Sequence, residues 1–340
     1  MSARDYFRPL PQVGPARPDH ARSLAGGWTW FTDVEVLARG RAPVVIPARE
    51  MPADVLQRLS VARSNVATLS MDRPQVMGIL NATPDSFSDG GTHAVARDAV
   101  AAGVAMVNAG ADLLDIGGES TRPGAQTVDG REEIKRIRPV IEGLRGAGVT
   151  VPISIDTRKV EVARAAVTAG ANLVNDVSGF TFDPALAGYC ANQNLPICVM
   201  HALGDPATMQ ETPQYDDVLL DVYDFLEGQI GILLSAGVSS GNIIADPGIG
   251  FGKTLAHNLA ILSRLGLFHG LGVPILLGAS RKGFIGKIGQ APEAKHRAPG
   301  SIGVALGALA QGVQVLRVHD VVETVQAVAM WRAVMRGTVS

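Results

Sequence analysis

The stretch AAGVAMVNAGADLLDIGG, residues 101–118, contains a helical pattern, an Ala-Gly-Ala turn and the short apolar run LLDI, in that order. The stretch ARAAVTAGANLVNDVSG, residues 163–179, repeats the arrangement further along the chain. A helix that turns through glycine into a strand, repeated in this way, is what right-handed β–α–β crossovers require. The repeat therefore predicts a parallel sheet whose strands are separated by helices.

The same alternation continues from Val76 to the end of the chain and gives eight strand and helix units. Polar residues follow nearly every strand, as they do at the active face of a (β/α)8 barrel. A doubly wound sheet also alternates strands and helices, but it rarely has polar clusters after nearly every strand. We therefore expect an α/β fold of the TIM-barrel type. The strands are expected at 76–80, 112–116, 152–156, 172–175, 196–200, 242–245, 274–277 and 313–317, with helices at 94–109, 131–146, 159–169, 184–193, 216–236, 255–267, 298–311 and 320–336.

The chain has 340 residues, more than the roughly 250 that one barrel needs, and the surplus lies at the front. Residues 1–70 are expected to form a small N-terminal strand and helix extension that covers one end of the barrel, and residues 71–340 the catalytic barrel domain. Within the extension we expect an extended arm over 1–24, paired β segments at 28–37 and 44–46, and a helix at 52–63. Nothing in the extension indicates chemistry.

Composition and charge exclude several classes of protein. Hydrophobic residues make up 46% of the chain and charged residues 18%, which supports a large core and argues against disorder. The net charge of −2 gives no basic field for nucleic acid. The longest apolar stretch, residues 302–310, is too short to span a membrane. Cys190 and Cys198 are unclustered, which indicates a reducing, cytoplasmic setting and neither a zinc site nor a disulfide framework.

Four side chains at predicted strand ends suit a flat polar ligand. Asp246 opens the Gly-rich segment DPGIGFGK and can accept two hydrogen bonds from a guanidine-like edge, while Asn175 offers a donor and an acceptor. Asp156 and Lys282 end two further strands, and this complement matches a pterin. Taken alone, Asp156 could instead cap a helix or pair with an arginine, so the inference depends on the whole set converging.

A second set suits an anion. Arg317 and His319 alternate along the last strand, so both side chains can face one group of ligand oxygens. Asn81, Thr121 and Arg122 follow other strands at the same face and offer a metal-binding amide and phosphate donors. A diphosphate with Mg²⁺ fits this set, because Mg²⁺ usually takes few protein ligands. Taken alone, His319 would be interpreted as a structural histidine beside Asp320 and not as an anion ligand.

His201 follows the fifth strand and could either bond a backbone carbonyl or touch a ligand. Nucleotide binding through known phosphate loops is not expected, because neither a GxxxxGK[ST] segment nor a GxGxxG segment opening a helix is present.

Eight ordered motifs make the chain resemble dihydropteroate synthase of the folate pathway over about residues 75–336. They are NATPDSFSDGG from Asn81, DIGGESTRPGA from Asp115, SIDTRK from Ser154, NDVSG from Asn175, Met200 with His201, DPGIGFGK from Asp246, SRKGFIG from Ser280 and RVHD from Arg317. Two departures are Ala82, where valine is common, and the segment HALGDPATMQ after Met200, where Met-Gln is more usual.

The resemblance implies condensation of 6-hydroxymethyl-7,8-dihydropterin diphosphate with 4-aminobenzoate to give 7,8-dihydropteroate and diphosphate, with Mg²⁺ as cofactor. It implies catalytic roles for Lys282, Arg317, His319 and Asp156. It assigns the pterin to Asp156, Asn175, Met200, Asp246 and Lys282. Diphosphate is assigned to Asn81, Thr121, Arg317 and His319, with Asn81 as metal ligand. Aminobenzoate, and the sulfonamides that compete with it, are assigned to Phe87, Arg122, Pro123, Phe251 and Ser280.

The sequence is also compatible with two other functions. One is a barrel that passes a methyl group from a methyl-folate to a corrinoid protein, which would not need the SRK, RVHD and TPDSFSDGG segments. The other is a catalytically silent pterin-binding paralogue, which would not need Asn81, Lys282, Arg317 and His319. A homodimer is also expected, because residues 302–309 are unusually apolar and small. No nucleic acid or membrane partner is expected.

Overall fold

The computed structural model describes residues 4–83, 91–120, 127–204 and 209–338. Eight parallel strands form one sheet in the spatial order β11, β10, β9, β8, β7, β6, β13, β12. The sheet closes through a parallel bridge between Ala245 and Ile275, so the predicted TIM barrel is confirmed. The strands are β6 (Gln75–Asn81), β7 (Leu113–Gly117), β8 (Ile153–Asp156), β9 (Leu173–Asp176), β10 (Ile197–Met200), β11 (Ile243–Asp246), β12 (Leu276–Leu277) and β13 (Val315–Val318).

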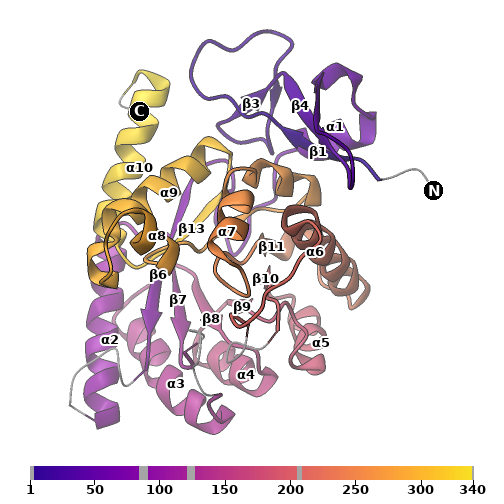
Figure 1. Cartoon of the computed structure of the whole chain (residues 1–340). Helices are drawn as coiled ribbons and strands as arrows, with labels where there is room; N and C mark the ends of the chain where they lie inside the picture. Colours follow the sequence, from indigo (N-terminus) through magenta and orange to yellow (C-terminus); the bar gives the residue numbers. More distant parts are fainter. Residues whose placement is uncertain (1–3, 84–90, 121–126, 205–208, 339–340) are drawn as a thin grey trace.

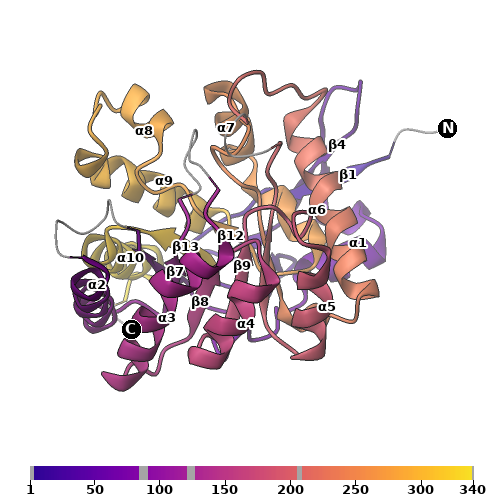
Figure 2. The ribbon, with the colours of Figure 1, turned by 90° about the horizontal axis from the view of Figure 1, so that it is seen from below.

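Helices surround the strands, as Figures 1 and 2 show. The ring consists of α2 (Gly91–Asn108), α3 (Gly130–Gly146), α4 (Val160–Ala169), α5 (Pro184–Asn192), α6 (Val218–Ser235), α7 (Leu255–Leu262), α9 (Ala298–Ala310) and α10 (Val321–Arg336). The repeated Ala-Gly-Ala turns end α2 and α4 with Gly110 at φ +99° and Gly170 at φ +120°, a conformation that favours glycine. Among the helices that the structure describes, none is long and apolar enough to cross a membrane.

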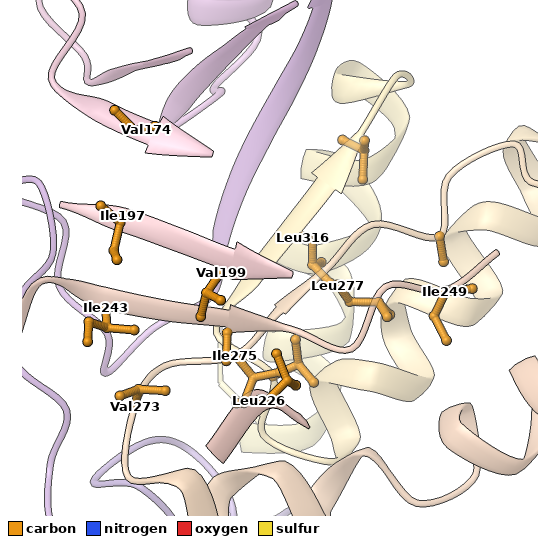
Figure 3. Close-up of a cluster of buried hydrophobic side chains, with 14 of the residues drawn as sticks. Val174, Ile197, Val199, Leu226, Ile243, Ile249, Val273, Ile275, Leu277 and Leu316 are labelled. Atoms are coloured by element: carbon orange, nitrogen blue, oxygen red, sulfur yellow. The ribbon is translucent and has the colours of Figure 1, made fainter. Parts of the chain in front are cut away.

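Buried apolar side chains fill the layer between the strands and the helices. Val199 of β10, Leu226 of α6 and Ile275 lie together there, in the cluster drawn in Figure 3. Close packing of these aliphatic side chains fixes the strands against the helices, and it therefore also fixes where the strands end.

The barrel interior has an apolar lower half and a polar upper half. Side chains two residues apart on a strand point to the same side, so Leu173 and Asn175 both face inward, as do Val315 and Arg317. The first residue of each pair is apolar and the second is polar. The lower layer includes Met77, Leu113, Leu173, Cys198, Ile244, Leu276 and Val315, and it is closed from below by Val66, Leu69 and Met71. Most polar side chains of the interior therefore lie at the end where the strands finish, and Ser154, in the layer of Leu173, is a buried polar exception.

The N-terminal extension packs at the end where the strands begin (Figure 1). It has a three-stranded antiparallel sheet of β1 (Tyr6–Pro9), β4 (Asp33–Leu37) and β5 (Val44–Pro47). It also contains the β2 (Arg22–Ser23) and β3 (Trp30–Phe31) pair, the short turn η1 (Ala48–Glu50) and helix α1 (Ala53–Ser60). Its own core includes Leu24, Phe31, Val34 and Leu59.

Two hydrogen bonds, one buried and one partly buried, attach the extension to the barrel. The guanidinium of Arg63 donates to the carbonyl of His269 at 2.9 Å, and the Trp28 indole donates to the carbonyl of Leu309 at 2.8 Å. His269 lies in the 3-10 turn η4 (Leu265–Leu271), which precedes β12. The extension therefore rests on the face opposite the polar half of the barrel.

Two expectations from the sequence were wrong in detail, and one helix was not expected. Residues 1–24 are not simply an arm, because Tyr6–Pro9 pairs with β4 in the register Tyr6 to Leu37. The helix expected over 255–267 ends at Leu262, and the chain then tightens into η4. An additional helix, α8 (Gly283–Ile288), follows the SRK segment, and two further 3-10 turns occur at η3 (Ser240–Asn242) and η5 (Ala294–His296).

Candidate active site

The ends of four neighbouring strands place polar residues in one row. Strand register sets Asn81 opposite Gly117, Gly117 opposite Asp156, and Asp156 opposite Asn175. A methyl group placed on Gly117 would lie 3.9 Å from the Asn81 amide oxygen and 3.7 Å from Cβ of Asp156. Glycine at this position therefore leaves a gap between the amide and the carboxylate at the barrel mouth.

Arg317 crosses the barrel and binds two carboxylates. Its Nε lies 2.5 Å from Oδ2 of Asp115, and its Nη2 lies 2.8 Å from Oδ2 of Asp156. The Asn175 amide donates to the same Asp115 oxygen at 3.1 Å. Burial opposes the charge of Arg317, but the two carboxylates outweigh burial and raise its pKa. Arg317, Asp115, Asp156 and Asn175 thus form one buried network.

Two oxygen atoms of this network have no hydrogen-bond partner among the described residues. They are Oδ1 of Asp115, whose side chain is 0% exposed, and Oδ1 of Asp156. Burial raises the pKa of Asp156, the Arg317 guanidinium opposes that rise, and the neighbouring Asp115 adds to it. A buried acceptor without a partner is unfavourable, so these oxygens favour a ligand that brings N–H donors.

Asp246 adds a third buried carboxylate at the end of β11. Its Oδ1 accepts a hydrogen bond from the Gly248 amide at 2.7 Å. Burial raises the pKa of Asp246, and the ammonium of Lys282 acts against that rise. Three carboxylates, from Asp115, Asp156 and Asp246, therefore lie near two cations, Arg317 and Lys282.

The DPGIGFGK segment is anchored to β10 from inside. Gly248 has φ +67°, and a Cβ on it would lie 1.9 Å from the carbonyl oxygen of His201, so only glycine allows this close approach. The ammonium of Lys253 lies 2.8 Å from Nδ1 of His201 and donates to the carbonyls of Gly248 at 2.9 Å and Phe251 at 3.1 Å. Burial, followed by the nearby Lys282, lowers the pKa of Lys253. Lys253 and His201 therefore support the segment from below.

Lys282 and Phe251 form one wall of the mouth. The Lys282 ammonium lies 4.4 Å from the centre of the Phe251 ring, a cation–π contact, and also donates to the carbonyl of Ile249. Burial lowers the pKa of Lys282 to about 7, Asp246 partly restores it, and Arg317 lowers it further. Lys282 is thus close to losing its charge at neutral pH.

Ser280 and His319 are joined above β13. The Ser280 hydroxyl oxygen accepts from the His319 backbone N–H at 3.1 Å and lies 3.1 Å from Nδ1 of the same ring. Arg281, between Ser280 and Lys282, has φ +57°, and its Nε donates to Asp320 at 3.0 Å. This backbone conformation is rare for a bulky residue, and the ion pair with Asp320 holds it in place. It sets the directions in which the chain carries the neighbouring side chains of Ser280 and Lys282.

The described residues expected at the site all lie at the strand-end face of the barrel. Met200 is 3% exposed at the end of β10, opposite Asp246 in the strand register. Within the ranges that the structure describes, no group of three or more His, Cys, Asp and Glu forms a metal cage. The expected residues Phe87, Thr121, Arg122 and Pro123 lie outside the described residues.

Sequence reasoning missed Asp115. The signal was a carboxylate inside the otherwise apolar run LLDI, two residues before Gly117 and therefore on the same inward side of the strand. Sequence reasoning also gave Lys253 no separate role from the rest of its glycine-rich segment, whereas in the structure its ammonium contacts His201 and the carbonyls of Gly248 and Phe251.

Comparison with known proteins relates this geometry to a family. A model of the family described as pterin binding enzyme matches residues 77–319. The dihydropteroate synthase of Escherichia coli K12 is 45% identical over 268 residues, which are 79% of this chain and 94% of that protein.

Solved structures give the same relation. The Xanthomonas albilineans dihydropteroate synthase with 4-aminobenzoic acid superimposes with a TM-score of 0.75 at 46% identity, over 80% of this chain and 97% of that one. A second structure of the enzyme from that organism, in complex with 7,8-dihydropteroate, has a TM-score of 0.71 at 44% identity, over 78% of this chain and 95% of that one. The chain therefore belongs to the dihydropteroate synthases, within the pterin-binding enzyme family.

Proposed function

We propose that this chain condenses 6-hydroxymethyl-7,8-dihydropterin diphosphate with 4-aminobenzoate, releasing diphosphate and forming 7,8-dihydropteroate. The observation that carries the proposal is the buried network of Arg317 with Asp115 and Asp156, in which two carboxylate oxygens lack partners among the described residues. A pterin ring presents several N–H donors in one plane, which such oxygens can accept. The similar structures with 4-aminobenzoic acid and 7,8-dihydropteroate support the same reaction.

The pterin is proposed to lie inside the mouth, against Asp156, Asn175, Asp246 and Lys282. The carboxylates accept from its amino and ring N–H groups, the Asn175 amide offers a donor and an acceptor, and Lys282 donates to its carbonyl or ring nitrogen. Met200 would pack beside the ring. Asp115 does not appear in the set expected from the sequence, and we add it because it holds Arg317 in position.

Diphosphate is proposed to lie above the pterin, near Asn81, Arg317 and His319, with Thr121 from outside the described residues. Nη1 of Arg317 makes no hydrogen bond to the described residues and can donate to the anion. Since the backbone N–H of His319 donates to Ser280, the Ser280 hydroxyl can in turn donate to Nδ1, which places the ring proton on Nε2. An Nε2–H group is a donor suited to a diphosphate oxygen.

The residues present fit a Mg²⁺ ion held mainly by diphosphate and water. The Asn81 amide oxygen borders the gap left by Gly117, and a single protein oxygen is sufficient for an ion that keeps its other ligands from substrate and solvent. Bound at Asn81, Mg²⁺ would offset the negative charge that builds on the departing diphosphate.

Aminobenzoate is proposed to lie against Phe251, Lys282 and Ser280, with Phe87, Arg122 and Pro123 contributing from outside the described residues. Sulfonamides would compete at the same place. The Phe251 ring offers an apolar wall, and the Lys282 ammonium lies over its face.

The chemistry needs no strong base. The bond between the pterin methylene carbon and the diphosphate oxygen breaks with its electrons going to diphosphate, helped by the electron-rich dihydropterin and by Arg317 and His319. The aniline nitrogen then bonds the methylene carbon and loses a proton, which the released diphosphate can accept. Exclusion of water from the mouth would keep it from trapping the cationic pterin first.

Two alternatives are less well supported. A methyltransferase acting on a corrinoid protein would not need the Ser280, Lys282, Arg317 and His319 constellation that lies at the mouth. A catalytically silent paralogue would not need it either. A steady-state assay decides: we expect diphosphate release that requires both the pterin diphosphate and aminobenzoate, and its absence in the purified protein would contradict the proposed function.

The unpaired cysteines support a reducing, cytoplasmic setting. Cys190 and Cys198 are both buried and free of disulfides. The proposed dimer rests on an apolar groove of about 480 Å³ lined by α7, α8 and α9. Leu259 is 42% exposed and Ile288 is 57% exposed at this groove, and a second copy of the chain would cover them.

We predict that the protein is a dimer and that Ile288→Asp weakens it. An unpaired carboxylate in an apolar interface is unfavourable, so the variant should shift toward monomer at micromolar concentration. Light scattering measures the mass directly. A monomeric wild type would contradict the prediction.

Gly117→Ala should impair the diphosphate side of the site without unfolding the protein. The added methyl makes only ordinary contacts, at 3.7 to 3.9 Å, but it fills the gap between Asn81 and Asp156. We expect kcat/KM for the pterin diphosphate to fall by about tenfold or more, since misplacement by about 1 Å is enough for such losses. The matched control is Gly188→Ala on α5, where nothing lies within 4 Å of the added methyl. Wild-type kcat/KM in Gly117→Ala would show that the gap is not used.

The charge of Lys282 predicts a pH dependence. Its pKa of about 7 means that the ammonium form is lost as pH rises through that value, so kcat/KM for the pterin diphosphate should fall above about pH 7. Lys282→Arg keeps a charge at all working pH values. We therefore expect Lys282→Arg to have a lower kcat/KM than wild type. Its kcat/KM should not fall near pH 7 as the wild-type value does. Titration of the substrate itself would appear equally in both enzymes, and an identical profile in the two would rule out Lys282 as the origin.

A further inference from the structure

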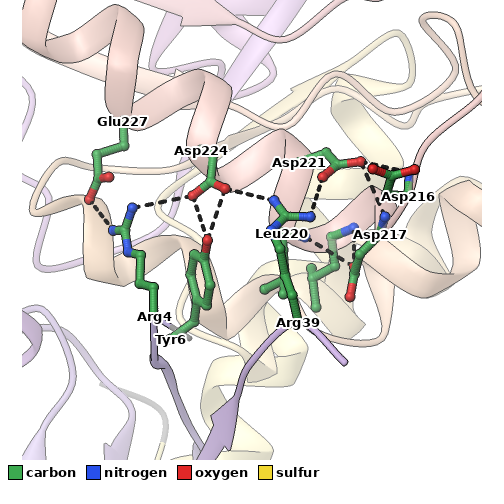
Figure 4. Close-up of polar contacts among 10 residues, drawn as sticks. Arg4, Tyr6, Arg39, Asp216, Asp217, Leu220, Asp221, Asp224 and Glu227 are labelled. Carbon is green, nitrogen blue, oxygen red and sulfur yellow. Dashed lines mark hydrogen bonds and ion pairs between the residues drawn. The ribbon is translucent and has the colours of Figure 1, made fainter. Parts of the chain in front are cut away.

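The N-terminal extension contacts helix α6 through hydrogen bonds and ion pairs. Arg4 and Tyr6 of the extension bind Asp224 and Glu227 (Figure 4), with Arg4 2.7 Å from Glu227 and the Tyr6 hydroxyl 2.8 Å from Asp224. The extension lies outside the part of the chain that the family model matches, residues 77–319. The family match therefore gives no role to the extension, and its contacts with the barrel are the evidence for one.

Arg39 makes a different contact one turn closer to the start of α6. Its guanidinium bridges two carboxylates of the helix, at 2.5 Å from Asp221 Oδ1 and 2.7 Å from Asp224 Oδ2. The other oxygen of Asp221 accepts from the backbone N–H groups of Asp216 at 3.0 Å and Asp217 at 3.2 Å (Figure 4). One carboxylate thus joins the extension to the segment that leads from β10 into α6.

The residue before Asp216 continues this connection into the active site. The Tyr215 hydroxyl donates to the carbonyl of Gly252 at 2.8 Å. Its ring meets the His257 ring edge to face, with centres 5.0 Å apart. The amide of Gln210, in the same connection, donates to the carbonyl of Gly250. The backbone is therefore held on both sides of Phe251, the residue that lies under Lys282.

We propose that the extension is a brace for the aminobenzoate side of the site. Arg39 fixes residues 215–217 through Asp221, and Tyr215 fixes the 250–252 backbone, so that both are positioning residues for Phe251. The proposal rests on the proposed function, which places aminobenzoate against Phe251. Exposed ion pairs contribute little to folding stability, and Arg39 is 40% exposed. Loss of Arg39 should therefore change the placement of Phe251 without unfolding the protein.

Arg39→Ala and Tyr215→Phe should raise KM for aminobenzoate by about 3- to 10-fold, the effect of losing one or two hydrogen bonds, and leave KM for the pterin diphosphate unchanged. The matched control is Arg4→Ala, which removes a contact of the same extension with α6 but has no bond to Asp221. It should leave both KM values unchanged. Because Arg39 acts through Tyr215, the double variant should resemble Tyr215→Phe alone. Arg39→Lys should restore part of the effect.

Hydrogen exchange of the full-length protein tests the brace without catalysis. Amides of residues 248–254 should exchange faster in Arg39→Ala and Tyr215→Phe than in wild type and Arg4→Ala. Unchanged exchange in Arg39→Ala would overturn the brace, as would an equal rise in both KM values or fully additive effects in the double variant. An inactive wild type with faster exchange in Arg39→Ala would overturn the proposed function and leave the brace standing.

Discussion

The pairing of Arg317 with Asp115 and Asp156 is the interaction on which the rest of the site depends. Three carboxylates in the upper half of the barrel would repel one another, and burial alone would neutralise them. One guanidinium that reaches across the barrel holds two of them, and Lys282 opposes the charge of the third, Asp246. The lower half of the barrel is filled mainly by apolar side chains, which separate these groups from the opposite end of the barrel. The result is a cluster of buried charged groups at the strand ends, in which two carboxylate oxygens have no hydrogen-bond partner among the described residues.

The residues at the barrel mouth are held in place by contacts with residues further from it. Glycines at 117 and 248 permit close approaches that a side chain would prevent or fill. Lys253 holds the 246–253 segment from inside, and Tyr215 holds it from outside. The extension packs against α6 and η4 and adds a further layer behind the β10 to α6 connection. Precision at Phe251 and Lys282 thus depends on groups that do not touch the proposed substrates.

Much of this could be predicted from the sequence. Strand ends were predictable because short apolar runs end in polar clusters and glycine turns precede several of them, and parallel strands bring their ends to one face. Asp156, Asn175, Asp246 and Lys282 follow from that rule. The role of Lys253 could not be predicted, because the contact that buries it against His201 joins two segments 52 residues apart. Pairing of β1 with β4 could not be foreseen either, because that contact joins two weakly patterned segments of the extension. Asp115 was visible as a charge within a strand, but its partner, Arg317, lies 202 residues away.

Calorimetric titration of a pterin into wild type and Asp156→Asn tests most directly whether the buried carboxylates recognise the ring. Asparagine keeps the shape and can still accept from Arg317, but it removes the charge and replaces one acceptor with a donor. We expect one pterin per wild-type chain, bound without diphosphate or aminobenzoate, and binding at least about tenfold weaker in the variant, equivalent to roughly 1.4 kcal/mol. Equal affinity in the two proteins would contradict it.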